Sequence, residues 1–431
     1  MTKQQNKGNT VAIITMFFMF AMVSFVTNMA APFGNIWKTH YEWSGMLGNM
    51  MNFAAYLIMG IPAGKLLSKI GYKKTALVAL GTGFIGMLVQ FLSSFMAIGL
   101  SALFVYLLGA FICGFCVCML NTVVNPMLNT LGGGGNRGNQ LIQTGGACNS
   151  LVATLTPLLA GAMIGTITKN TAMSDVRPLL LIALAVFAVS FIIIYFVTIP
   201  EPNLNKTVAK KKDDPYSAWS FRHLVLGVVA IFFYVGIEVG IPGELNFYLS
   251  DPGSMGAGLG EGAAVIGGAI VAIYWLLMLV GRLVSSAISS KVSTRKQLTA
   301  VSEIAIVLVL AAILIPSTVR VTMPGFINGE FIMREVPLEA LFLVLCGLCT
   351  SLMWGSIFNL AVEGLGKYTE QASGIFMMMV VGGGIMPLIQ NRVARVAGYM
   401  NSYWIVLGML AFILFYALYG SRNVNKDIPT E

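Results

Sequence analysis

Residues 101–120 read SALFVYLLGAFICGFCVCML and carry no charge. As a helix rising about 1.5 Å per residue, this run crosses a hydrocarbon core of about 30 Å. Comparable apolar runs recur from Val11 onward, and glycine, proline and charge divide them. They predict an all-α integral membrane protein with twelve transmembrane helices, near 12–37, 45–68, 75–97, 101–130, 139–166, 178–198, 222–249, 261–288, 298–316, 338–364, 371–391 and 398–420.

Composition agrees with a chain solvated by lipid. Of the 431 residues, 57% are hydrophobic and 10% are charged, and the mean hydropathy is +0.82. A soluble domain carries roughly 25% charged residues. The first run, Val11 to Trp37, lacks the short apolar core and the cleavage site of a signal peptide, so we retain it as a span.

Basic residues set the expected orientation. With both termini cytoplasmic, the inner segments hold 19 Lys and Arg residues and the outer segments hold 7. This is the bias that cytoplasmic segments of membrane proteins show. It accounts for the net charge of +9, so we expect no nucleic-acid partner.

A polar stretch from Glu201 to Arg222 separates six spans from six. We therefore expect an N-terminal half (1–198), a cytoplasmic linker (199–221) and a C-terminal half (222–431). A glycine and basic cluster follows the second span of each half, Gly64 to Lys74 first and Gly281 to Lys296 second. Such internal repeats predict a substrate site near the bilayer midplane between the halves.

Two levels of family resemblance follow from these motifs. The stretch Gly64 to Lys74 resembles the loop between spans two and three of the major facilitator superfamily, with glycines that permit a tight turn. Ser68 stands where that loop usually has an acid, which puts a charge-based latch in doubt. A narrower resemblance, to the fucose/glucose/galactose permease family, rests on LNTVVNP (120–126), FFYVGIEV (232–239), IFNL (357–360), LG (365–366) and GGGIMPLIQ (382–390).

The narrower resemblance implies import of a monosaccharide or small related sugar, often with a coupled cation. We accordingly expect a multi-pass protein of a bacterial inner membrane with both termini cytoplasmic. The resemblance does not specify the sugar, or whether a proton, sodium or neither is coupled.

A sugar site needs paired hydrogen-bond donors and acceptors, which amides supply, and an aromatic face for C–H groups. Asn121 and Asn125 lie four residues apart and share a helix face. The predicted substrate-binding residues are Asn28, Asn121, Asn125, Gln143, Tyr234, Asn246, Trp275, Trp354, Asn359 and Gln390. A packing role is the alternative, because polar side chains in membrane helices often bond only to neighbouring helices.

Coupling departs from the family pattern. The proton-coupled members of the permease family share two acidic residues inside the membrane, one on the first span and one on the fourth. The resemblance places Asn28 and Asn121 at these two positions of this chain. An amide does not exchange a proton near neutral pH. Glu238 is the acid nearest the centre of a span, and a carboxyl there needs a partner, a cavity or a proton. Glu238 is therefore the predicted coupling residue.

Two other classes of function make different demands on the sequence. A major facilitator exporter of hydrophobic compounds would suit the 26 Met and 26 Phe residues, which are also ordinary membrane residues. An enzyme would need a nucleophile and base or a metal set, whereas His40 and His223 lie near span ends. Cys346 and Cys349 lack further partners, so we expect packing. We predict no enzyme activity, no cofactor, no metal and a monomer.

Overall fold

The computed structural model describes residues 3–41, 44, 47–164, 171–201, 215–251, 253–260, 263–327, 330–425 and 427–430. Most of the predicted linker, 202–214, lies outside these residues. The N-terminal helices are α1 (Lys3–His40), α2 (Leu47–Ser93), α3 (Leu100–Leu131), α4 (Gly135–Ile164) and α5 (Arg177–Phe196). The C-terminal helices are α6 (Arg222–Ser250), α7 (Ala263–Ile288), α8 (Thr294–Leu314), α9 (Leu338–Thr350), α10 (Met353–Ala361), α11 (Thr369–Met378), α12 (Gly382–Ala397) and α13 (Tyr399–Phe415).

The helices account for the twelve predicted spans. Within the described residues, ten helical segments are long and apolar enough to cross a membrane. One of them, α2, has 47 residues and holds two spans, because the backbone leaves helical geometry at Gly71. The 30-residue helix α4 is not among those ten, and it supplies the predicted fifth span. The chain is a multi-pass membrane protein.

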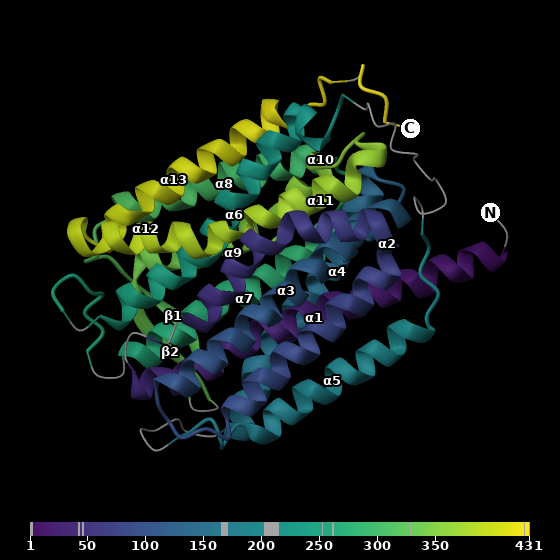
Figure 1. Ribbon diagram of the computed structural model, residues 1–431. Helices are drawn as coiled ribbons and strands as arrows, with labels where there is room; N and C mark the ends of the chain where they lie inside the picture. The colour runs from purple at the N-terminus through teal and green to yellow at the C-terminus, as the bar shows by residue number, and fades with distance from the viewer. Residues whose placement is uncertain are drawn as a thin grey trace.

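The two termini lie at one end of the bundle and a β-hairpin lies toward the other (Figure 1). Strands β1 (Arg320–Ile327) and β2 (Glu330–Pro337) pair antiparallel between α8 and α9. No strand is among the elements predicted from the sequence. The hairpin buries Met323 and Val336 and leaves Phe331 83% exposed. The membrane-crossing part of the fold remains helical.

Gly71 marks the turn between the second and third spans. Its φ of 83° is a conformation that side chains other than glycine rarely adopt. The Glu201 carboxylate accepts hydrogen bonds from the backbone N–H groups of Tyr72 (2.7 Å) and Lys73 (2.8 Å). The Ser68 hydroxyl donates a 2.9 Å hydrogen bond to the Gly64 carbonyl of its own helix. An acid from the end of the N-terminal helices therefore fixes this turn.

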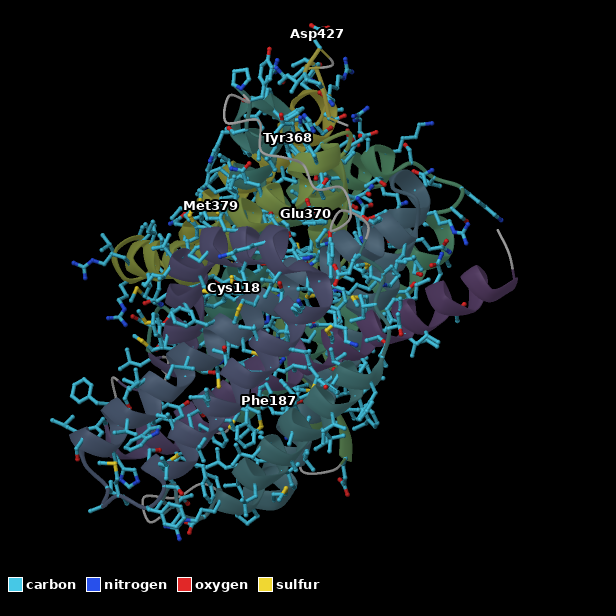
Figure 2. All side chains as sticks on the ribbon, turned by 45° about the vertical axis from the view of Figure 1, so that its right-hand side comes forward. Cys118, Phe187, Tyr368, Glu370, Met379 and Asp427 are labelled. Carbon is cyan, nitrogen blue, oxygen red and sulfur yellow. The ribbon has the colours of Figure 1, made fainter. Side chains whose placement is uncertain are left out.

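Glycines bring α2 of the N-terminal helices against α11 of the C-terminal helices. A Cβ added at Gly374 would lie 2.6 Å from the Gly60 carbonyl and 2.7 Å from the Gly64 Cα atom. Gly64, expected in a turn, serves this helix contact instead. Nearby, Glu370 accepts a 3.4 Å hydrogen bond from the Tyr72 hydroxyl. Figure 2 shows Glu370 between Cys118 in the middle and Asp427 at the top.

Replacing Gly374 by Leu should push α2 and α11 apart, because the Gly60 and Gly64 backbone occupies the space a side chain needs. Overpacking of this kind costs about 1–3 kcal/mol. The purified variant should melt several degrees below wild type in a thermal unfolding assay. Gly408→Leu is the matched control, since an added Cβ there meets nothing within 4 Å. Equal melting midpoints for both variants would contradict the packing argument.

Candidate functional site

Asn125 and Trp354 join the two groups of helices. Trp354 lies in the first turn of α10, and its indole Nε1 donates to Asn125 Oδ1 of α3 at 3.2 Å. Asn125 is fully buried and Trp354 is partly buried. The indole ring therefore reaches across the boundary between groups while part of its surface stays accessible.

The predicted amide pair shares one face of α3, as its spacing indicates. Asn125 Nδ2 donates to the Asn121 carbonyl at 2.9 Å, and Asn121 Nδ2 donates to the Tyr56 hydroxyl at 2.7 Å. Both amides are buried. These contacts fix the orientation of the Asn125 carbonyl that faces Trp354.

Aromatic rings continue the site on the C-terminal side. The rings of Tyr234 and Trp354 are 6.3 Å apart at 63°, and those of Trp354 and Phe376 are 6.1 Å apart at 88°. The Tyr234 hydroxyl is buried and faces the Glu238 carboxyl one helical turn away, but it makes no close hydrogen bond among the described residues. A buried hydroxyl without a partner is costly, so a ligand group could satisfy it.

Glu238 is paired with a residue that the sequence analysis placed in a basic cluster after its span. Arg282 lies inside α7, six residues before its end, and Arg282 Nη2 is 3.4 Å from Glu238 Oε1. The side chains are 11% and 17% exposed, respectively. The assignment of Arg282 to an inner segment was therefore wrong. The carboxyl gains the partner that a charge within a span requires.

Gln143 brings α4 to the same region. Its Nε2 donates to the Leu352 carbonyl at 2.8 Å, two residues before Trp354. Tyr234 and Glu238 lie four residues apart, on one face of α6. The residues gathered here, which we name the central cluster, are Asn125, Gln143, Tyr234, Glu238, Arg282 and Trp354.

Three predicted residues lie apart from these contacts on partly accessible positions. Trp275 is 41% exposed and lies seven residues before Arg282, on the same face of α7. Asn246 is partly buried, eight residues after Glu238 in α6, and its Oδ1 has no hydrogen-bond partner among the described residues. Both are about 10–12 Å along their helices from the ion pair. Asn28 donates to the Ser24 carbonyl within α1 at 2.8 Å.

Two predicted residues make contacts within the C-terminal helices. Asn359 Nδ2 donates to Thr294 Oγ1 at the start of α8 at 3.1 Å, and it lies about 140° around α10 from Trp354. Gln390 Nε2 donates to Ser402 Oγ of α13 at 3.4 Å. These bonds support packing between helices, and the two residues stay predictions as ligand contacts.

A bundle of apolar helices with a polar and aromatic cluster between its two groups is the architecture of a membrane transporter. The sequence profile of the Major Facilitator Superfamily matches residues 11–387. The chain belongs to this superfamily.

Relatives extend over nearly the whole chain. A glucose/galactose transporter of Brucella abortus biovar 1 (strain 9-941) is 33% identical and covers 98% of this chain and 96% of its own length. The L-fucose-proton symporter of Escherichia coli (strain K12) is 22% identical over 96% of this chain and 93% of its own. The crystal structure of the transporter FucP in the outward conformation has a TM-score of 0.75 and 20% identity, covering 96% of this chain and 100% of FucP.

The Glu238–Arg282 pair generates a stability prediction. Glu238→Gln leaves a guanidinium that cannot shed its proton, so it should lower the melting midpoint. The double variant Glu238→Gln/Arg282→Gln should lose less stability than the sum of the two single variants, because one lost interaction is counted in both. Thermal unfolding of the four proteins checks this, and strictly additive losses would contradict the pairing.

Proposed function

We propose that the chain is a secondary active transporter that imports a neutral sugar, a hexose or small oligosaccharide, by alternating access. The observation that carries the proposal is the Asn125–Trp354 contact across the two groups of helices. It places an amide at the N–H edge of an indole ring, near the buried Tyr234 hydroxyl. A sugar needs this combination of hydrogen-bonding groups and apolar ring surface. The relatives described above, a glucose/galactose transporter and an L-fucose-proton symporter, support the same substrate class.

The rocking units in this proposal are the halves 1–198 and 222–431, joined by the linker 199–221. One chain supplies both halves, so the monomer is the functional unit. The termini lie at the same end of the bundle (Figure 1), in agreement with two cytoplasmic termini in a bacterial inner membrane. The sugar would bind Asn125, Gln143, Tyr234 and Trp354, with Asn28, Asn121, Asn246 and Trp275 extending the site.

Export of hydrophobic compounds is the competing proposal. A purely apolar ligand would offer no hydrogen bond to the buried Tyr234 hydroxyl. Buried polar groups left unpaired cost about 1–3 kcal/mol each. Uptake of radiolabelled glucose, galactose and fucose into proteoliposomes separates the two functions. Saturable uptake of one sugar supports import, and efflux of apolar dyes without any sugar uptake would overturn it.

Asn125→Ala should weaken sugar binding by roughly 5–150-fold, because it removes hydrogen bonds worth about 1–3 kcal/mol from a desolvated ligand. Asn121→Ala should act in the same direction because Asn121 is itself a proposed sugar-binding residue, and the backbone carbonyl that accepts from Asn125 Nδ2 is kept in this variant. The affinity is measured by isothermal titration calorimetry on purified protein. Asn401→Ala is the control, since this exposed amide donates to the Ala397 carbonyl four residues earlier in the chain. Unaltered affinity in both Asn121 and Asn125 variants would contradict the site.

Glu238 is the proposed coupling residue. If a proton drives accumulation, Glu238→Gln should abolish it and spare counterflow exchange, which needs binding and rocking but no net proton movement. Uptake under imposed proton or sodium gradients measures this, with the exposed Glu303→Gln of α8 as control. Undiminished gradient-driven accumulation in Glu238→Gln would eliminate Glu238. Accumulation that follows sodium would make the carboxylate a cation ligand, and no response in wild type would indicate a facilitator.

A further inference from the structure

Polar side chains connect α4 and α7 along a shared line, which we name the α4–α7 seam. Asn139 Nδ2 donates to Ser289 Oγ at 3.1 Å, and Thr144 Oγ1 and Ser286 Oγ share a 2.6 Å hydrogen bond. Arg282 continues the line farther along α4. Residue numbers rise on one helix as they fall on the other, so the helices run antiparallel. The seam thus joins an N-terminal helix to a C-terminal helix over several turns.

Arg282 is the charged end of this seam. Its Nη1 donates to the Gly146 carbonyl at 2.9 Å and to Ser150 Oγ at 2.5 Å, both on α4. Its Nε donates to the Ser351 carbonyl at 3.1 Å, and Nη2 faces Glu238 at 3.4 Å. One buried guanidinium therefore has two acceptors on each side of the boundary.

Gly146 leaves room for the Arg282 side chain on the surface of α4. A Cβ added at Gly146 would lie 3.3 Å from Arg282 Cδ and 3.6 Å from Arg282 Nε. The absence of a side chain lets Arg282 lie flat against the α4 backbone. The fork of donors on an arginine can reach several acceptors in different directions, which an ammonium group does less well.

We propose that Arg282 is a positioning residue that couples the central cluster to closure of the α4–α7 seam. Opening the seam removes the Gly146 and Ser150 acceptors and leaves Arg282 with Ser351 and Glu238. Hydrogen bonds from a charged donor are among the stronger ones in proteins, so their loss opposes opening. A change in the contacts or the charge of Glu238 changes the interactions that hold the Arg282 guanidinium. It therefore changes the balance between the open and the closed seam. The coupling consequence rests on the proposed transport function, whereas the closure itself does not.

Distances across the seam test the proposal without any sugar. Arg137 at the start of α4 and Lys291 just after α7 are exposed and suit spin labels on introduced cysteines. A Cys148→Ser background removes the one native thiol that is not buried. Double electron–electron resonance on the full chain in lipid nanodiscs gives the populations with the seam closed and open.

Arg282→Gln should raise the ratio of open to closed populations by about tenfold, as expected for the loss of charged hydrogen bonds. Arg282→Lys should give a smaller shift in the same direction, and Ser150→Ala a smaller one still. Arg295→Gln is the matched control, because Arg295 bonds to Ser421 within the C-terminal helices. Arg295→Gln should give the same distribution of distances between the two spin labels as wild type.

Three results would overturn the proposal: an unchanged distribution in Arg282→Gln, an equal shift in Arg295→Gln, or a shift toward the closed state. If Arg282→Gln does not fold, Gly146→Ala serves instead, since it crowds the guanidinium without removing charge. Gly268→Ala, where an added Cβ meets nothing within 4 Å, is its control. An open shift with Gly146→Ala alone supports the proposal, and no shift overturns it. If Arg282→Gln shifts the populations toward the open seam but the wild-type protein takes up no sugar, the proposed transport function is rejected and the role of Arg282 in closing the seam is kept.

Discussion

The structure depends on how a carboxylate and a guanidinium are accommodated inside a bundle surrounded by lipid. Neither charge is stable alone in hydrocarbon, so Glu238 of α6 and Arg282 of α7 must be near each other. Because one ion pair leaves most guanidinium donors unsatisfied, Arg282 also needs backbone and hydroxyl oxygens, and α4 supplies two of them. This requirement brings α4 of the N-terminal helices against α7 of the C-terminal helices and sets the central cluster beside their contact.

The two main contacts between the groups of helices differ in chemistry. Between α2 and α11, glycines let the backbones approach, and the contact depends on close packing. Between α4 and α7, hydroxyl, amide and guanidinium groups exchange hydrogen bonds. Packing contacts weaken with small separations, whereas hydrogen bonds can be replaced one by one by water. In the proposed transport cycle, the polar seam is therefore the contact that the charge state of the site can control.

The spans followed from sequence because a lipid-exposed backbone must satisfy its own hydrogen bonds, which forces long apolar runs into helices. The shared face of Asn121 and Asn125 followed from helical spacing. Contacts such as that of Asn125 with Trp354 could not be predicted from the sequence, because they join residues that are far apart in the chain. The pairing of Arg282 with Glu238 was not predicted, because a Gly-Arg pair near the end of a span has the composition of a basic loop. The hairpin was missed although Asn328-Gly329 between two β-prone runs is a turn signal.

The central claim is that sugar binds at the junction marked by Trp354, and intrinsic fluorescence tests it most directly. A sugar that displaces water from the indole should change the emission of wild type in a saturable way. Trp354→Phe should lose this change, while Trp404→Phe should keep it, since Trp404 lies on α13 and is 49% exposed. A saturable change that persists in Trp354→Phe, and disappears when a tryptophan outside the central cluster is replaced, would place the sugar elsewhere and contradict the account.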